Sequence, residues 1–175
     1  GDLSFILLRF LKRKGSIQAI DFADNLLDVA KAKSIYKSST IISWLNRNAI
    51  DTGLQESSFD GIVMAYGLRN LEDPFKGLKE IYRLLKPSKN AGILDFNINP
   101  KGSISDRFQK LYLRYLVIPI ASLFNLKKEY QYLEKSLHEF PDGNKQIEMA
   151  LSIGFKKARY LSFAGRQMGI LILRK

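Results

Sequence analysis

The chain has 175 residues, the length of one domain, and its 46% of hydrophobic residues supply a core and exclude a disordered chain. With no Cys and one His, disulfides, cysteine nucleophiles, thiolate zinc sites and histidine-rich metal sites are excluded, so we expect an intracellular protein with an organic cofactor and no metal. The formal net charge of +11 fits either an anionic partner or a lysine-rich surface, and we favour the surface because the basic residues are scattered.

The first half of the chain alternates helical and strand patterns. Apolar residues at helical spacing predict a helix over residues 3–12. Two short apolar runs predict strands over 16–22 and 41–45, with a helix over 23–33 between them. The next run, 59–67, is almost continuously apolar, which is typical of a strand covered on both faces.

The second half continues the alternation and closes with two strands. Asp73 is a good N-cap and Pro74 suits the first helical position, so we expect a helix over 72–87. The remaining elements are a strand over 91–96, a mostly helical segment over 104–140, a helix over 142–155 and strands over 157–163 and 169–175. Because the loop between the last two strands is short, they must be antiparallel. The pattern predicts an open α/β sheet, mostly parallel with an antiparallel last strand.

Polar residues follow the strands of this predicted sheet, at the edge where open α/β sheets bind ligands. Asp21 ends a strand about 20 residues after Gly1, and a carboxylate at that offset from a glycine-rich turn accepts both hydroxyl hydrogens of a ribose. The other strand ends carry Asn48 and Ala49, then Ala65, Tyr66, Arg69 and Asn70, and finally Asp95, Phe96 and Asn97. We therefore expect a nucleotide-like ligand at one edge of the sheet.

Four stretches of the chain are similar to one class of enzyme: “GDLSF”, “AIDF”, “SFDGIVMAYGLRNLEDPFKGLKEIYRLLKP” and “ILDF”. They resemble the class I S-adenosylmethionine-dependent methyltransferases and, within them, the ubiquinone/menaquinone C-methyltransferase (UbiE/MenG) family. The combination of “YGLRN” with a helix that begins at Pro and ends “YRLLKP” is highly specific to this family. The similarity covers the whole chain, and two later stretches resemble the branch that methylates a naphthoquinol on the phylloquinone pathway: “EYQYLEKSLHEFPDGNKQIEMALSIGF” and “GRQMGIL”.

The resemblance implies that residues 1–175 are a single methyltransferase domain with a Rossmann-like sheet. It also implies that the N-terminal helices and the first, central strand of this domain are missing, which leaves the two neighbouring strands with unpaired edges. The implied cofactor is S-adenosyl-L-methionine. The residues implied to bind it are Gly1 and Asp2 at its methionine part, Asp21 at the ribose, Phe22, Asn48 and Ala49 at the adenine, and Ala65 facing the sulfonium.

The implied substrate is a prenylated naphthoquinol, of the 2-phytyl-1,4-naphthoquinol or demethylmenaquinol type, which is methylated at a ring carbon. Because the chain has no Cys to form an adduct, the ring must be the electron-rich hydroquinone, activated when a general base takes a hydroxyl proton. No Asp or Glu in the sequence stands out as that base.

Arg69 and Asn70 are the catalytic candidates, because a guanidinium stabilises a developing phenolate or orients a water. The alternative is that both residues only shape the turn after the strand. Tyr66, Tyr112 and Tyr130 are candidates for an apolar substrate pocket. Aromatic residues at helical spacing are more often plain core, and that alternative stays open for the last two.

Two other functions remain as alternatives. An RNA methyltransferase fits the basic charge, but the chain has neither the Asn/Asp-Pro-Pro-aromatic element of amino-methylating enzymes nor the Cys of base C5-methylating enzymes. We therefore expect no nucleic-acid partner. The second alternative is a truncated chain without catalytic activity.

The longest apolar stretch, 111–124, is shorter than the ~20 residues of a membrane span and contains Arg114 and Pro119. The wider segment 108–124 suits either a membrane interface or a buried lid. We expect a cytoplasmic protein, with or without peripheral contact to the membrane that holds the quinone pool. The sequence does not determine the oligomeric state.

Overall fold

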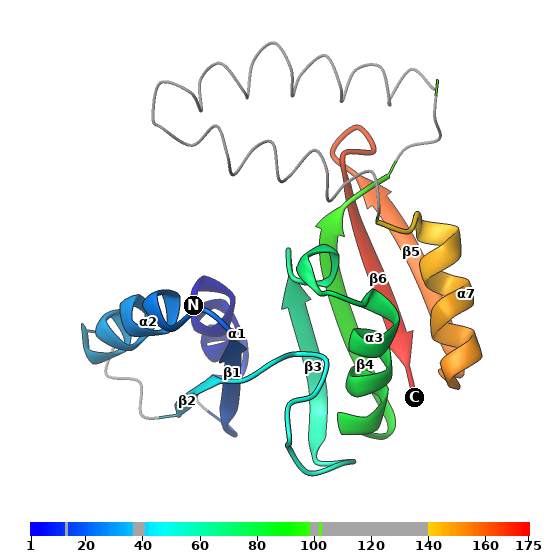
Figure 1. Ribbon diagram of the computed structural model, residues 1–175. Coiled ribbons are helices and arrows are strands. Elements are labelled where there is room, and N and C mark those ends of the chain that lie inside the picture. The colour runs from blue at the N-terminus through cyan, green and yellow to red at the C-terminus, as the bar shows by residue number, and fades with distance from the viewer. Residues whose placement is uncertain (13, 37–40, 99–101, 103–139) are drawn as a thin grey trace. The chain divides into compact units, whose positions relative to one another are not determined.

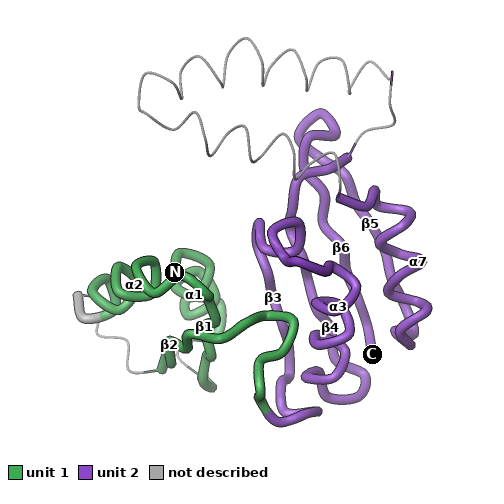
Figure 2. The backbone as a smooth tube through the Cα atoms, viewed as in Figure 1, with its two compact units in different colours: residues 1–54 green, residues 55–175 purple. Residues whose placement is uncertain are grey.

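The chain divides into two compact units, residues 1–54 and 55–175 (Figure 2), and each unit is described by itself. The computed structural model describes residues 1–12, 14–36, 41–98, 102 and 140–175. Nearly all of the predicted helical segment 104–140, with Tyr112 and Tyr130, lies outside the described residues. The assignment of the whole chain to one domain stays a prediction.

The described part of the first unit contains helices on a pair of parallel strands (Figure 1). Its elements are α1 (Asp2–Phe10), β1 (Ile17–Asp21), α2 (Asp24–Tyr36) and β2 (Ile42–Asn46). The strands pair from Ile17 opposite Ile42 to Asp21 opposite Asn46, so both end at the same edge. A small core of Phe5, Ile17 and Ile42 joins α1 to the strands. The order of elements is the one that the sequence predicts.

The second unit is built around a four-stranded sheet (Figure 1). Its described elements are β3 (Phe59–Ala65), the 3-10 turn η1 (Leu68–Asn70), α3 (Pro74–Leu84), β4 (Leu85–Phe96), α7 (Gly143–Ile153), β5 (Lys157–Phe163) and β6 (Met168–Arg174). The strand order is β3-β4-β6-β5, with β3 parallel to β4 and β6 antiparallel to both of its neighbours. The predicted antiparallel last strand is confirmed, and it lies between β4 and β5.

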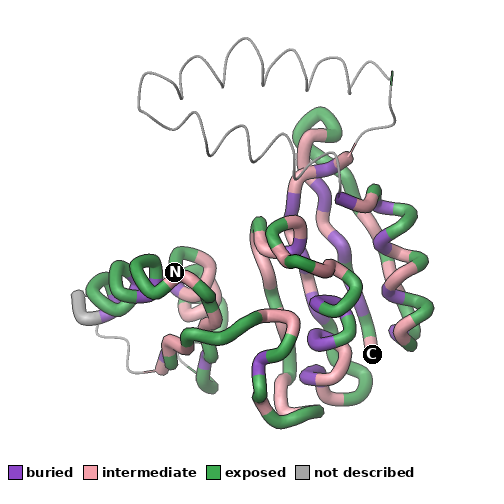
Figure 3. The backbone as a smooth tube through the Cα atoms, viewed as in Figure 1, coloured by how far each residue is buried: buried purple, intermediate pink, exposed green. Residues whose placement is uncertain are grey.

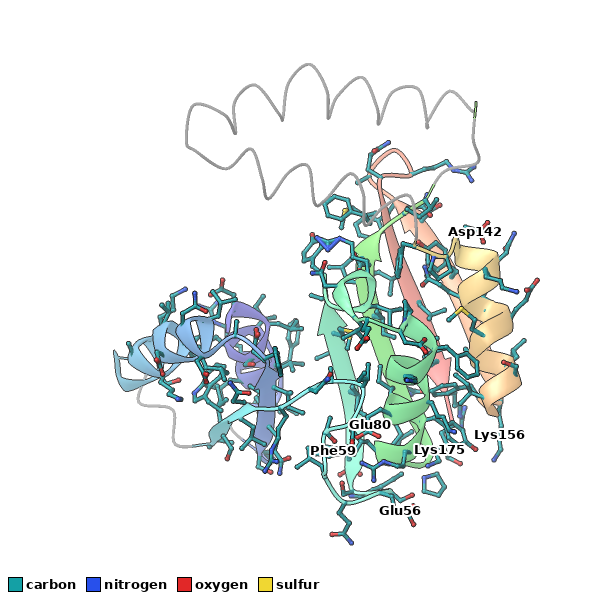
Figure 4. The ribbon with its side chains drawn as sticks, in the orientation of Figure 1. Glu56, Phe59, Glu80, Asp142, Lys156 and Lys175 are labelled. Carbon is teal, nitrogen blue, oxygen red and sulfur yellow. The ribbon has the colours of Figure 1, made fainter. Side chains whose placement is uncertain are left out.

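The helices α3 and α7 each begin directly after an aspartate N-cap. Asp73 Oδ1 accepts the backbone N–H groups of Phe75 and Lys76 at 2.8 and 3.2 Å. Asp142, at the start of α7 in Figure 4, accepts the Lys145 N–H at 2.9 Å. These side chains satisfy N–H groups that have no partner within the first helical turn. Both caps lie where the sequence predicts the start of a helix.

The C-terminal end of α3 differs from the prediction. The helix ends at Leu84 instead of reaching Pro87, because Leu85 has an extended backbone (φ −66°, ψ 137°) and begins β4. Lys175 contributes at this helix end (Figure 4), where its Nζ donates to the Leu85 carbonyl oxygen at 2.7 Å and lies 4.6 Å from the Tyr82 ring centroid. The C-terminal residue of the chain thus stabilises the junction between α3 and β4.

The core of the second unit lies between one face of its sheet and the helices α3 and α7 (Figure 3). Because side chains alternate along a strand, this face takes every second residue of β4 and β6. Its buried apolar residues include Ala91, Ile93, Leu171 and Leu173, which belong to one cluster with Leu78, Ile81, Ala150 and Phe155. On the other face Val63, Leu161 and Ile172 are 43%, 54% and 40% exposed, so the described residues leave that face largely open.

Among the described residues, β1 pairs only with β2 and β3 pairs only with β4, so each of these strands has one unpaired edge. The absence of a central strand stays a prediction. The α/β order of elements and the parallel pairs β1–β2 and β3–β4 agree with the predicted Rossmann-like class. No helix in the described ranges is long and apolar enough to cross a bilayer.

Candidate functional site

The carboxyl end of β1 presents an acidic and an aromatic side chain. Asp21 is the last residue of β1, and its Oδ1 accepts the Ala23 N–H at 3.0 Å, which fixes the exposed carboxylate in the turn before α2. Phe22 is 74% exposed, a large exposure for an apolar ring. An exposed carboxylate beside an exposed ring suits a ligand that carries a diol and a flat base.

The end of β2 holds this loop in place. Asn46, the last residue of β2, donates from Nδ2 to Asp24 Oδ1 and, at 3.5 Å, to the carbonyl oxygen of Phe22. Asn46 is not among the predicted site residues. The signal that could have identified it is its position at the end of a strand that pairs with the strand of Asp21.

Asn48 and Ala49 follow β2 in a tight turn. Asn48 Oδ1 accepts the Ile50 N–H at 3.1 Å, and the backbone of Asn48 forms an isolated antiparallel bridge with Asp51. Asn48 is exposed and Ala49 is half-buried. Because β1 and β2 are parallel, this turn follows the same edge of the pair as Asp21.

Gly1 lies where a side chain has no room. A Cβ at this position would be 2.8 Å from Ala30 Cβ in α2 and 2.8 Å from Trp44 Cη2 in β2, closer than the 3.0 Å that real Cβ atoms respect. Glycine at such a place permits close packing between helix and strand in nucleotide-binding folds. Asp2 begins α1 and forms an exposed ion pair with Lys33, with Oδ1 and Nζ 3.3 Å apart.

In the second unit, β3 runs into a strained turn. Tyr66 follows Ala65 with φ 56°, a left-handed conformation that is rare for a bulky residue and that clusters at functional sites. Its N–H donates to the Leu94 carbonyl oxygen at 2.8 Å, and its own carbonyl oxygen accepts Asn70 Nδ2 at 2.9 Å. The Tyr66 and Phe96 ring centroids lie 5.6 Å apart. These contacts hold the strained residue from β4 and from η1.

Arg69 lies over the end of β4. Its N–H donates to Asp95 Oδ2 at 3.2 Å, and its Nε lies 3.4 Å from Asp95 Oδ1, with the two side chains 12% and 5% exposed. Nε is buried and makes no well-aligned hydrogen bond, so this contact is an ion pair. Nη1 donates to Asn70 Oδ1 at 3.0 Å, and Cζ lies 5.2 Å from the Phe96 ring centroid.

Asp95 lies at the centre of this cluster, although its sequence pattern marks it only as a strand end. Burial raises the pKa of its carboxyl group, against the hydrogen bonds from the Arg69 and Phe96 N–H groups and the charge of Arg69, which lower the pKa. The signal that could have identified it is an acidic residue near the end of β4, one residue before the last, much as Asp21 ends β1.

The structure thus brings Tyr66, Arg69 and Asn70 together with Asp95 and Phe96 at the carboxyl ends of β3 and β4. We call these five residues the β3–β4 cluster, and Ala65 lies next to it as the last residue of β3. The other predicted residues within the described ranges belong to the first unit: Gly1, Asp2, Asp21, Phe22, Asn48 and Ala49.

Comparison with known proteins gives close relatives along the whole chain. A model of the ubiE/COQ5 methyltransferase family matches residues 1–173. The 2-phytyl-1,4-naphtoquinone methyltransferase of Nostoc sp. strain PCC 7120 is 40% identical, over 100% of this chain and 76% of that protein. The chloroplastic 2-phytyl-1,4-beta-naphthoquinone methyltransferase of Arabidopsis thaliana is 36% identical, over 98% of this chain and 67% of that protein.

Solved structures share the fold at low sequence identity. A SAM-dependent methyltransferase from Aquifex aeolicus has a TM-score of 0.65 and 17% identity, over 95% of this chain and 74% of that chain. The phosphoethanolamine N-methyltransferase 2 of Haemonchus contortus, in complex with S-adenosyl-L-methionine, has a TM-score of 0.69 and 13% identity, over 91% of this chain and 43% of that chain. These similarities establish the fold.

The fold is that of the class I S-adenosylmethionine-dependent methyltransferases. The chain belongs to the ubiE/COQ5 methyltransferase family, which confirms the resemblance found in the sequence, and it is an enzyme that uses S-adenosyl-L-methionine.

Proposed function

We propose that this protein methylates a ring carbon of a prenylated naphthoquinol in phylloquinone or menaquinone biosynthesis. The observation that carries this proposal is that relatives named as 2-phytyl-1,4-naphtoquinone methyltransferases match 100% of this chain at 40% and 38% identity. The acceptor is the reduced quinol, because the chain has no Cys that could activate the ring through an adduct.

We infer that the exposed strand ends of the first unit hold the cofactor. When bound, S-adenosyl-L-methionine supplies a methyl group on a positively charged sulfur. Asp21 accepts hydrogen bonds from the ribose hydroxyls and Phe22 packs against the adenine, in keeping with the exposure of both side chains. The absence of room for a Cβ at Gly1 supports its assignment as a motif glycine. The remaining inferred contacts in this unit are Asp2, Asn48 and Ala49, and Ala65 of the second unit is inferred from the sequence resemblance alone.

Arg69 and Asn70 are the proposed catalytic residues. As the quinol hydroxyl gives its proton to a water molecule, the Arg69 guanidinium stabilises the negative charge that develops on the oxygen. Asn70 orients the guanidinium by accepting a hydrogen bond from Nη1. Tyr66, which is 44% exposed, packs against the apolar ring. Tyr112 and Tyr130 are proposed substrate contacts from the sequence pattern alone.

A methyl-transfer assay tests this function. The protein is mixed with S-adenosyl-L-methionine labelled at the methyl group and with 2-phytyl-1,4-naphthoquinone, either reduced with dithionite or left oxidised. We expect a labelled methylated product from the reduced ring and none from the quinone. Arg69→Gln should lower kcat by about 100- to 1000-fold, the usual effect of removing one donor to a developing oxyanion.

Arg159→Gln is the matched control, because Arg159 is an exposed arginine on β5 outside the β3–β4 cluster. This variant should keep the wild-type kcat. A folded wild-type protein that leaves the reduced ring unlabelled would contradict the proposal and favour a chain without this activity. Labelling of RNA with a strong dependence on salt would favour an RNA methyltransferase.

We also propose that the protein is cytoplasmic and contacts the membrane that holds the quinone pool. The support is the chemistry of the proposed substrate, whose prenyl chain partitions into a bilayer. Flotation with vesicles that contain the prenylated quinol tests this contact. Recovery of all the protein in the vesicle-free fraction would argue against it.

A further inference from the structure

Asp95 is a buried acidic residue that has no role in the reaction proposed above. A carboxylate removed from water is costly unless a charge or hydrogen bonds compensate it. Asp95 is only 4% exposed. Its carboxylate oxygens contact the Arg69 N–H and the Arg69 side chain, and Oδ1 also accepts the Phe96 N–H at 2.9 Å. Arg69 therefore compensates the carboxylate twice, through its N–H and its charge, and the backbone of Phe96 and Leu68 adds to this.

The two oxygens of Asp95 act on different parts of Arg69. Oδ2 accepts the backbone N–H and so sets the position of η1, while Oδ1 faces Nε and so sets the direction of the side chain. We propose that Asp95 is a positioning residue that holds η1 and aims the Arg69 guanidinium for methyl transfer. This inference rests on the proposed function of Arg69.

The rest of the β3–β4 cluster depends on this anchor. With Nε directed at Asp95, Nη1 reaches Asn70 Oδ1, and the guanidinium lies over the Phe96 ring. Asn70 in turn donates to the Tyr66 carbonyl oxygen. Nη2 has no hydrogen-bond partner among the described residues, so it is the donor available to a substrate oxygen.

Asp95 acts through Arg69 and not on the substrate itself. Its oxygens are turned toward the η1 backbone and the guanidinium, and the residue has almost no exposed surface. Burial raises the pKa of the Tyr160 hydroxyl on β5, and the charge of Asp95 raises this pKa further. These neighbours account for the environment of the carboxylate without a substrate contact.

Asp95→Asn tests the inference, because it keeps the shape of the side chain and removes its charge. A displaced catalytic group costs about 100-fold in rate, so we expect kcat to fall by about that factor while KM and the affinity for S-adenosyl-L-methionine stay within about twofold. Asp60→Asn is the matched control, since Asp60 is an exposed aspartate on β3 that pairs with Lys86 and Lys89. It should leave kcat unchanged.

A double-mutant cycle separates positioning from a merely structural role. If Asp95 acts through Arg69, the variant Arg69→Gln/Asp95→Asn should have the kcat of Arg69→Gln alone. Multiplied losses in the double variant would overturn the inference, as would a wild-type kcat in Asp95→Asn. Should Asp95→Asn not fold, Asp95→Glu takes its place in the same cycle, because its longer side chain also displaces the guanidinium.

Nuclear magnetic resonance gives a readout that does not depend on the reaction. We expect the Arg69 Nε–H to give a resolved signal, which is assigned by its absence in Arg69→Gln. The chemical shift of this signal should move to the value of a solvent-exposed arginine in Asp95→Asn and stay unchanged in Asp60→Asn. An unmoved signal in Asp95→Asn would overturn the positioning role. A wild-type protein with this signal but no quinol methylation would refute the proposed function and leave the Asp95–Arg69 contact established.

Discussion

Gly169 on β6 gives the sharpest test of the packing in the second unit. A Cβ at this position would overlap Cζ and Oη of Tyr160 on the neighbouring strand β5 and lie 2.8 Å from Cε1. The Tyr160 ring has little room to move, because it also packs closely against Gly143 at the start of α7. A Cβ at Gly143 would lie 2.6 Å from Cγ of the ring. Gly169→Ala should therefore force a well-packed ring out of place.

The size of the effect follows from a comparison of two glycines. Overpacking a core costs about 1–3 kcal/mol, while replacing a strand glycine by alanine gains about 0.5–1 kcal/mol of backbone entropy. Gly92 in β4 is the matched control, because no described atom lies within 4 Å of a Cβ built there. The free energy of unfolding should be about 1–3 kcal/mol lower in Gly169→Ala than in Gly92→Ala, since the entropy gain is common to both.

Urea unfolding followed by far-UV circular dichroism measures this difference. The Tyr160→Leu background supplies the internal check, because there the alanine at 169 no longer meets a ring and its penalty should largely disappear. Equal stability of Gly169→Ala and Gly92→Ala would refute the reasoning. A penalty that persists in the Tyr160→Leu background would place its cause elsewhere than in the ring.

Two further predictions concern a titration and a helix cap. Burial, with the charges of Asp95 and Asp142, raises the pKa of Tyr160 from 10.0 to about 12. Between these pKa values the unfolded chain loses a proton that the folded chain keeps, so the free energy of unfolding should fall as the pH rises through this window. A spectrophotometric titration should show a tyrosine that ionises near the upper value, and this ionisation should be absent in Tyr160→Phe. Asp73→Ala should lower the free energy of unfolding, measured in urea, by about 1 kcal/mol, because two N–H groups of α3 lose their acceptor. Asp73→Asn should lower it by less, and equal losses in the two variants would argue against the cap.

Much of the fold could be predicted because its signals are local. The cap at Asp73 and the helical spacing after it act within a few residues, and they predict the start of α3 correctly. The end of the same helix was harder to predict. The chain leaves the helix at Leu84 because the next residues pair as β4, and pairing with a distant strand has no signature in the local sequence.

The candidate site divides in the same way. The strand-end positions of Asp21, Arg69 and Asn70 follow from the alternation of apolar runs and turns, and the YGLRN stretch identified the family that the comparisons confirm. The exposure of Phe22 and the absence of room at Gly1 depend on neighbours contributed by other elements, so only the structure supplies them.

By itself, the sequence determined the class of fold, the family and the residues at the strand ends, because periodicity, capping and motif spacing are written along the chain. The tertiary structure alone decided that Asp95 anchors Arg69, residues that lie 26 positions apart. The parallel register of β3 and β4 brings them together, and burial makes their pairing necessary, since a carboxylate withdrawn from water needs a compensating partner. Register and burial are properties of the assembled sheet, and no single stretch of sequence carries them.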